Sequence, residues 1–128
     1  MENLDKICAE YGYHIAERMG KAAGDYKKAE NMITKALHVL REQGLYAFGL
    51  FCKAEDLKVL EDIVKELLKD KQLIDNGDLL EEIRKDGGLA SRIDYLLLSV
   101  HMLEKTLIYA RYHAKAQKES ERGGGNQV

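Results

Sequence analysis

The chain has 128 residues, of which 45% are hydrophobic and 33% charged, and it carries a formal net charge of −2 with neither proline nor tryptophan. This balance excludes a disordered chain, and so small a net charge gives no global basic field that would by itself indicate a nucleic-acid partner. The length suits one modest core. A proline-free chain rich in Leu, Ala, Glu and Lys predicts an all-α fold, a compact helical bundle of about five to six helices with a long C-terminal helix.

Cysteine usage and hydropathy indicate the compartment. Cys8 and Cys52 are far apart and form no CxxC pair, so we expect small core residues in a reducing cytoplasm. The N-terminus has no signal-peptide pattern, and the most apolar run, YLLLSV at 95–100, is too short for a membrane span. We therefore expect a cytoplasmic protein without a membrane partner.

Two amphipathic helices are predicted in the first third of the chain. Residues 3–23 repeat apolar side chains on one face, and Asn3 is a suitable N-cap. Residues 25–43 form the second helix, and Gly44 stands where helices commonly end in a left-handed residue. Gly44 is thus expected to separate the second helix from the segment that follows.

That segment, LYAFGLFC at 45–52, is short and apolar nearly all round. It predicts a third helix that must be covered on several sides, because such a helix is not stable when exposed to water. Gly49 lowers helix stability there, so we expect another backbone to pack close to it. We interpret the segment as a buried connector between longer helices.

A fourth helix is predicted over 56–71, where apolar residues recur at heptad spacing. Asp78 and Glu81 match an N-cap and its N3 partner, and they predict a short fifth helix that ends before Gly87. Both helices lie in the most acidic part of the chain, since residues 55–87 hold eleven acidic and six basic side chains. The near-neutral total therefore hides mildly basic parts on either side of an acidic one.

The final helix is predicted to open at Ser91 and Asp94, a second capping pair, and to reach Glu119. We expect residues 1–119 to form a single helical domain and residues 120–128 to be a flexible C-terminal tail. Besides one apolar seam, this helix carries apolar residues on its other faces. Such a helix either lies at the centre of its bundle or uses part of its surface to bind a partner. We favour a partner because few elements remain to cover the helix.

The sequence contains no catalytic motif, since both a glycine-rich phosphate loop and a GxSxG serine are missing. His14-x-x-Glu17 and His101-x-x-Glu104 have the spacing of helical di-metal sites, but their order is reversed and the partner helices carry no inward glutamates. We interpret them as surface pairs and predict neither enzymatic activity nor a cofactor. A small helical enzyme or metal protein built on these four residues is the third hypothesis.

Basic residues form stripes on two of the predicted helices. On the second helix they lie opposite the apolar face, together with Asn31 and His38, and on the last helix they lie beside the apolar seam. Two such stripes could hold a phosphate backbone, although lysine stripes are usually just solvated faces. Tyr26, Tyr109 and Tyr112 lie on the same helices and could stack on bases. The predicted nucleic-acid-binding residues are Lys27, Lys28, Lys35, Arg41, Arg111, Lys115, Lys118 and Arg122.

The order of these features resembles the small subunit of type III CRISPR effector complexes, the Cmr type. Three segments carry the resemblance: the Tyr-Lys segment at 25–28, the Gly-Leu pair and apolar run at 44–51, and a last helix that opens on Tyr95 and closes on the basic and aromatic run at 109–115. The resemblance covers roughly residues 20–117, in order. The absence of proline leaves the subtype open, so the related Csm-type or another helical small subunit is an alternative.

This resemblance implies a non-catalytic subunit in antiviral defence. Such subunits stack in several copies as an inner filament beside the other subunits of the effector complex, and their basic face lines the channel for guide RNA and target RNA. Base pairing reads the sequence, so the protein holds only the RNA backbone. The main alternative is a helical adaptor or regulatory protein that dimerises through its C-terminal helix without RNA. The expected protein-interface residues are Leu45, Phe48, Phe51, Leu98, Met102 and Tyr109.

Overall fold

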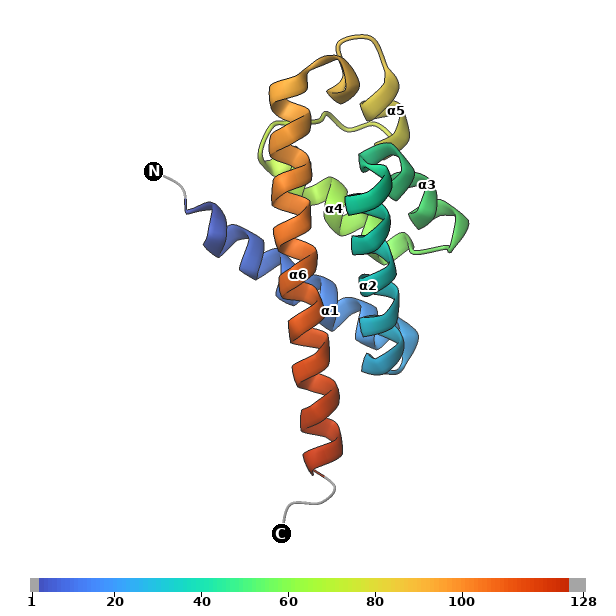
Figure 1. The fold of residues 1–128 in the computed structure, drawn as a ribbon, viewed down its shortest axis with the longest axis vertical. Coiled ribbons are helices and arrows are strands. Elements are labelled where there is room, and N and C mark those ends of the chain that lie inside the picture. The colour runs from blue at the N-terminus through green and yellow to red at the C-terminus, as the bar shows by residue number, and fades with distance from the viewer. Residues whose placement is uncertain (1–2, 125–128) are drawn as a thin grey trace.

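Residues 3–124 are described by a computed structural model, with side chains through residue 121. Six α-helices and one 3₁₀ turn, η1, account for most of this range, and it contains no strand. The all-α prediction is confirmed (Figure 1). In chain order the elements are α1 (Leu4–Ala23), α2 (Tyr26–Gln43), α3 (Leu45–Ala54), α4 (Lys58–Asp70), α5 (Leu79–Arg84), η1 (Leu89–Ser91) and α6 (Ile93–Gly124).

The predicted start of α1 and end of α2 are confirmed. The Asn3 side chain accepts a hydrogen bond from the Lys6 amide at 3.2 Å and so caps α1. Asp25 caps α2 in the same way, through the Lys27 amide at 2.8 Å. Gly44 ends α2 with a φ angle of +93°, a conformation that residues with side chains rarely adopt. The chain turns there, and α3 begins at the next residue.

The short apolar helix predicted at 45–52 is α3, which extends to Ala54. It packs against α2, α4 and α5, and Phe48 is fully buried. Gly49 faces α5, where a Cβ atom on this glycine would lie 2.7 Å from Cδ2 of Leu80. The expectation of a close backbone at Gly49 is therefore wrong, because α5 covers this position with leucine side chains.

The loop between α4 and α5 is held to the rest of the molecule. Its apolar residues Leu73 and Ile74 are buried. The buried carboxylate of Glu82 accepts hydrogen bonds from the amides of Asp75 at 2.8 Å and Gly77 at 3.1 Å. Burial by itself raises the pKa of this carboxyl, but the two amides and a neighbouring lysine outweigh burial, so the pKa lies below its usual range.

Helix α6 is the longest element and packs mainly against α1 and α2. Its apolar seam, including Leu107 and Ala114, is buried against α1 and α2. The helix begins at Ile93 rather than at the predicted Ser91 cap. Ser91 instead ends η1, and its hydroxyl donates a hydrogen bond to the Gly88 carbonyl at 2.9 Å. The predicted capping pair is therefore displaced by the preceding turn.

The C-terminal end of α6 also differs from the prediction. The helix continues to Gly124 rather than ending at Glu119. The run AKAQKESE at 114–121 consists mostly of strong helix formers, and nothing in it stops the helix before the glycines. The first residues of the expected tail are thus helical, and residues 125–128 lie outside the described range.

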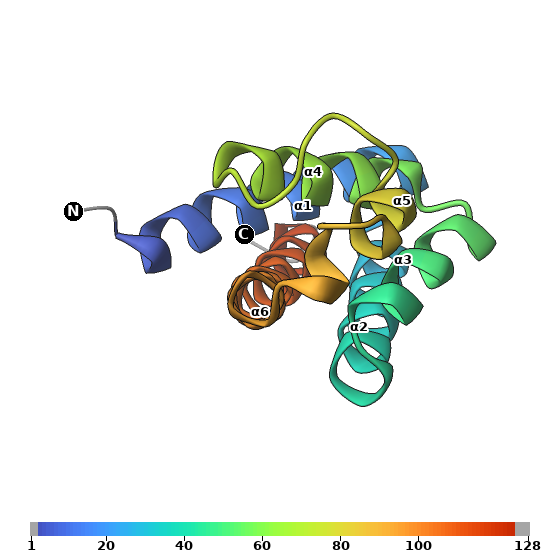
Figure 2. The same ribbon diagram turned by 90° about the horizontal axis from the view of Figure 1, so that it is seen from above.

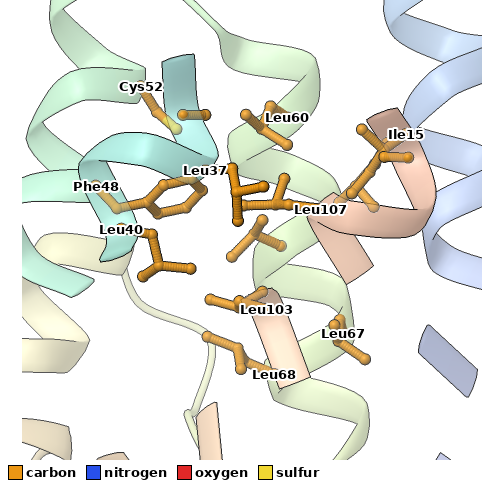
Figure 3. Packing of buried hydrophobic residues seen from close by; sticks show 14 of the residues in the cluster. Ile15, Leu37, Leu40, Phe48, Cys52, Leu60, Leu67, Leu68, Leu103 and Leu107 are labelled. Atoms are coloured by element: carbon orange, nitrogen blue, oxygen red, sulfur yellow. The ribbon is translucent and has the colours of Figure 1, made fainter. Parts of the chain in front are cut away.

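Two pairs of helices enclose the apolar core. Seen from above, α1 and α4 lie on one side of the bundle, and α2 and α6 lie on the other (Figure 2). Side chains from all four helices meet between them (Figure 3). Among these are Ile15 of α1, Leu37 of α2, Leu60 of α4 and Leu103 of α6, each at most 3% exposed. One side of the α2–α6 pair consequently faces away from the core.

Candidate nucleic-acid interface

Helices α2 and α6 pack side by side in antiparallel directions. Arg41 binds Glu104 at 2.9 Å near one end of α2, and Lys118 binds Glu30 at 2.7 Å near the other. Since α1 and α4 cover the opposite side of this pair, the remaining side faces outward (Figures 1 and 2). We call it the α2–α6 face, and its basic residues are Lys27, Lys28, Lys35, Arg41, Arg111 and Lys115.

Helical spacing places cations from both helices on this face. On α2, Lys27 and Lys35 are exposed and lie away from the buried Leu37. On α6, Arg111 and Lys115 are exposed and lie one turn apart. Two stripes that are distant in the sequence therefore border a single surface.

Most cations of the α2–α6 face are available for binding. An exposed cation without a partner can bind a phosphate without first breaking an ion pair. Five of the six meet this condition, because they make no ion pair within the described residues. They are Lys27, Lys28, Lys35, Arg111 and Lys115.

Three predicted nucleic-acid-binding residues differ from these five. Lys118 points between α2 and α6, where its side chain is 19% exposed and Glu30 holds its ammonium group. Its role is corrected to a structural one, because its helical position lies on the seam that faces α2. Arg41 is exposed but bound to Glu104. The side chain of Arg122 lies outside the described residues.

The acidic surplus of residues 55–87 is spread over α4, α5 and the loops beside them, and the larger part of it lies in the loops. Some cations in this segment are held by nearby carboxylates: Lys58 pairs with Asp62 at 2.9 Å, and Arg84 pairs with Glu81 at 2.7 Å. The unpaired cations thus lie on the α2–α6 face, while residues 55–87 hold eleven acidic and six basic side chains. Such a division orients a polyanion toward the α2–α6 face.

The predicted protein-interface residues are divided between core and surface. Leu45, Phe48 and Met102 are buried in the chain's own core. This part of the prediction is wrong, because α4 and α5 pack against α3 and because α1 covers one side of α6. Leu98 is exposed, and Phe51 is half-buried.

Two of the three tyrosines suggested for base stacking are used in helix packing. Tyr109 is half-buried and donates a hydrogen bond to Asp5, whose carboxylate Lys105 also binds at 2.8 Å. The hydrogen bonds from Lys105 and Tyr109 hold the pKa of Asp5 below its usual range. Tyr26 donates a hydrogen bond to a glutamate of α1 at 3.3 Å. Tyr112, by contrast, is 61% exposed.

The sequence patterns do not point to Tyr13, which is 46% exposed on α1. Its ring lies edge-on to the ring of His113 on α6, with 5.6 Å between centroids. The two residues are far apart in the sequence, and no periodic pattern connects them. Only the crossing of α1 and α6 brings them together.

The two histidine–glutamate pairs are surface groups whose glutamates have other partners. His14 and His101 are exposed, Glu104 is bound to Arg41, and Glu17 accepts a hydrogen bond from a tyrosine of α2. Within the described residues, no group of three or more His, Cys, Asp or Glu side chains is arranged to hold a metal ion. That part of the chain also lacks a helix with the length and apolarity needed to cross a membrane.

The chain matches no protein-family model, and no curated protein or solved structure matches it at a significant level. Membership of the type III CRISPR small subunits therefore stays a prediction from the residue pattern. The structure adds the α2–α6 face, with its five unpaired cations, as the candidate site.

Proposed function

We propose that this protein is a non-catalytic small subunit of a type III CRISPR RNA-guided effector complex in the cytoplasm, and that its α2–α6 face holds the backbone of the guide–target RNA. The observation that carries the proposal is the gathering of five exposed, unpaired cations on one surface of two helices. Two stripes on neighbouring helices can contact more phosphates at once than a single stripe can.

The chemistry of the α2–α6 face suits backbone binding. Each lysine or arginine that neutralises a phosphate releases a condensed counterion, so the affinity falls steeply as salt rises. Contacts of this kind hold RNA in place without reading its sequence, which is the task left to a protein when base pairing supplies the specificity. The protein partners in this proposal are further copies of the chain in a filament and the larger subunits of the complex.

Native mass spectrometry of the tagged chain, purified gently from its host, tests this function. We expect several copies together with larger proteins and a short RNA of uniform length. A bare monomer or dimer without RNA would overturn the proposal. A parallel purification with Arg111 and Lys115 both changed to Gln distinguishes the RNA contacts from the protein contacts. The larger proteins should still co-purify with this variant, while the RNA should be lost.

A second candidate function, an adaptor that dimerises through α6 without RNA, is favoured by one surface feature. Ile93 and Leu97 are each 62% exposed and Leu98 is 38% exposed, all in the first turns of α6. Apolar side chains grouped in this way are typical of protein contacts. A dimer in sedimentation equilibrium that Leu97→Glu converts to a monomer, together with no measurable RNA affinity, would favour the adaptor.

A further inference from the structure

An apolar hollow of about 250 Å³ lies between the end of α1, the start of α2 and the start of α4. Buried side chains from all three helices line it, among them Met19, Ala29 and Leu60. The lining residues Ala22 and Ala23 are exposed, so the hollow opens to solvent. Pockets for drug-sized ligands commonly measure about 300–1,000 Å³. This smaller hollow suits one or two aliphatic side chains of a protein partner.

The chain carries a matching apolar surface at the beginning of α6. Ile93 and Leu97 are the most exposed large aliphatic side chains of the described residues, and Leu98 follows them; we call these three residues the apolar patch. Ile93 and Leu97 are four residues apart, so they share one face of the helix. The beginning of α6 is at the top of Figure 1, whereas α1 ends and α2 begins near the bottom. The apolar patch and the hollow therefore cannot meet within one molecule.

The charges beside the two surfaces have opposite signs. Arg92 precedes the apolar patch, and its guanidinium lies over the ring of a neighbouring tyrosine, 3.9 Å from the centroid, without an ion pair in the described residues. Asp56 lines the hollow and follows Glu55, and in the same range both carboxylates are exposed and make no ion pair. Asp94 beside the patch and Lys58 at the hollow are a weaker second pair, since Lys58 already binds a carboxylate of α4. The two surfaces are thus complementary in charge as well as in apolar character.

We propose that the apolar patch of one copy of the chain inserts into the hollow of the next copy, with Arg92 against Asp56. Because two different surfaces meet, the contact is heterologous and can continue from copy to copy instead of ending at a dimer. A symmetric dimer through the patch alone would leave the hollow and its carboxylates uncovered. The contact supplies the association between copies that the proposed function requires. It does not depend on RNA, because neither surface includes the five unpaired cations of the α2–α6 face.

Sedimentation velocity of the purified chain without RNA, over a range of concentrations, tests the contact. We expect the wild type to form species larger than a dimer as the concentration rises. Leu97→Glu places a charge in the patch, and Ala23→Trp blocks the hollow from an exposed position, so each should weaken association by about tenfold or more. Leu50→Glu is the matched control, since Leu50 is an exposed leucine of α3 outside both surfaces. Circular dichroism checks that each variant is folded.

A mixture of the two variants distinguishes a heterologous contact from a symmetric one. Leu97→Glu keeps an intact hollow and Ala23→Trp keeps an intact patch, so an equimolar mixture should form a dimer and nothing larger. A mixture that stays monomeric, or a wild type that stays monomeric at every concentration, would overturn the proposal. The RNA and the larger proteins in the native purification test the proposed function separately, so either can fail while the other stands.

Arg92→Gln and Asp56→Asn test the charged part of the contact. Residue 56 has a φ angle of +54°, which asparagine tolerates well, so this variant keeps the backbone as it is. Each change should weaken association by about two- to fivefold, and the double variant should be no weaker than either single one. Losses that simply add in the double variant would show that Arg92 and Asp56 do not meet.

Discussion

Gly12 of α1 lies directly against α6 beside Tyr109. A Cβ atom on Gly12 would lie 2.8 Å from Cβ of Tyr109 and 2.9 Å from the carbonyl oxygen of Thr106. Both distances are shorter than side chains tolerate, so only glycine lets the two helices cross this closely. The crossing also sets the position of the neighbouring Tyr13. One glycine thereby fixes both the packing of α1 against α6 and the contact of Tyr13 with His113.

Gly12→Ala should destabilise the protein. The added methyl group would push against backbone atoms of α6, and overpacking of this kind costs about 1–3 kcal/mol, more than alanine gains in helix propensity. Gly49→Ala is the matched control, because its methyl group would meet the end of the flexible Leu80 side chain instead. Urea unfolding followed by circular dichroism measures both. A Gly12→Ala protein as stable as wild type would show that the crossing is looser than described.

Glu82→Gln should destabilise the protein at neutral pH. The carboxylate accepts two amide hydrogen bonds from the α4–α5 loop, and an amide side chain would turn an NH₂ group toward one of them, at a cost of about 1–3 kcal/mol. The pKa of Glu82 is lowered on folding, so its contribution is complete above the ordinary value of 4.5 and is lost as the pH falls through the folded value. The difference between wild type and Glu82→Gln should therefore shrink toward zero in acid. Glu81→Gln, at an exposed surface pair, should change stability little at any pH.

Changing Arg111 and Lys115 to Gln should reduce the salt dependence of RNA binding. Each lost phosphate contact removes about one unit from the slope of log affinity against log salt, so we expect the slope to fall by about 1–2. Lys118→Gln is the control on the same helix, because Lys118 is bound to Glu30 rather than exposed. It should lower the stability and leave the slope unchanged. If Lys118→Gln alone flattened the slope, the assignment of the unpaired cations would be wrong.

Both cysteines should be unreactive in the folded protein. Cys8 and Cys52 are each 1% exposed, and burial raises the pKa of Cys52 to about 12, with the charge of Glu61 adding to the effect. The reactive thiolate is therefore scarce at neutral pH. We expect Ellman's reagent to modify neither thiol before unfolding and both in guanidinium chloride. Prompt modification of the native protein would contradict the packing of α3 and α1.

Local residue patterns were sufficient to predict the helices. Apolar periodicity located every long helix, and Asn3 and Gly44 marked ends that depend only on neighbouring backbone groups. The start of α6 was missed because Ser91 has two local uses, and the sequence does not say whether its hydroxyl caps a helix or closes a turn. The prediction that other elements cover the unusually apolar α3 was correct, but the sequence did not identify those elements.

Part of the candidate site could be predicted from spacing within single helices, and the rest depends on how separate helices pack. The basic stripes on the second and last helices follow from spacing within each helix, so the composition and order of residues were enough to find them. Whether the stripes share a surface, whether Lys118 is exposed or bound to Glu30, and whether Tyr13 meets His113 all depend on how separate helices pack. Helical periodicity is a property of neighbouring residues, whereas packing joins residues that are far apart in the chain. For that reason the sequence alone predicts which side chains a helix offers, and the packing of α1, α2 and α6 selects those that remain free to bind.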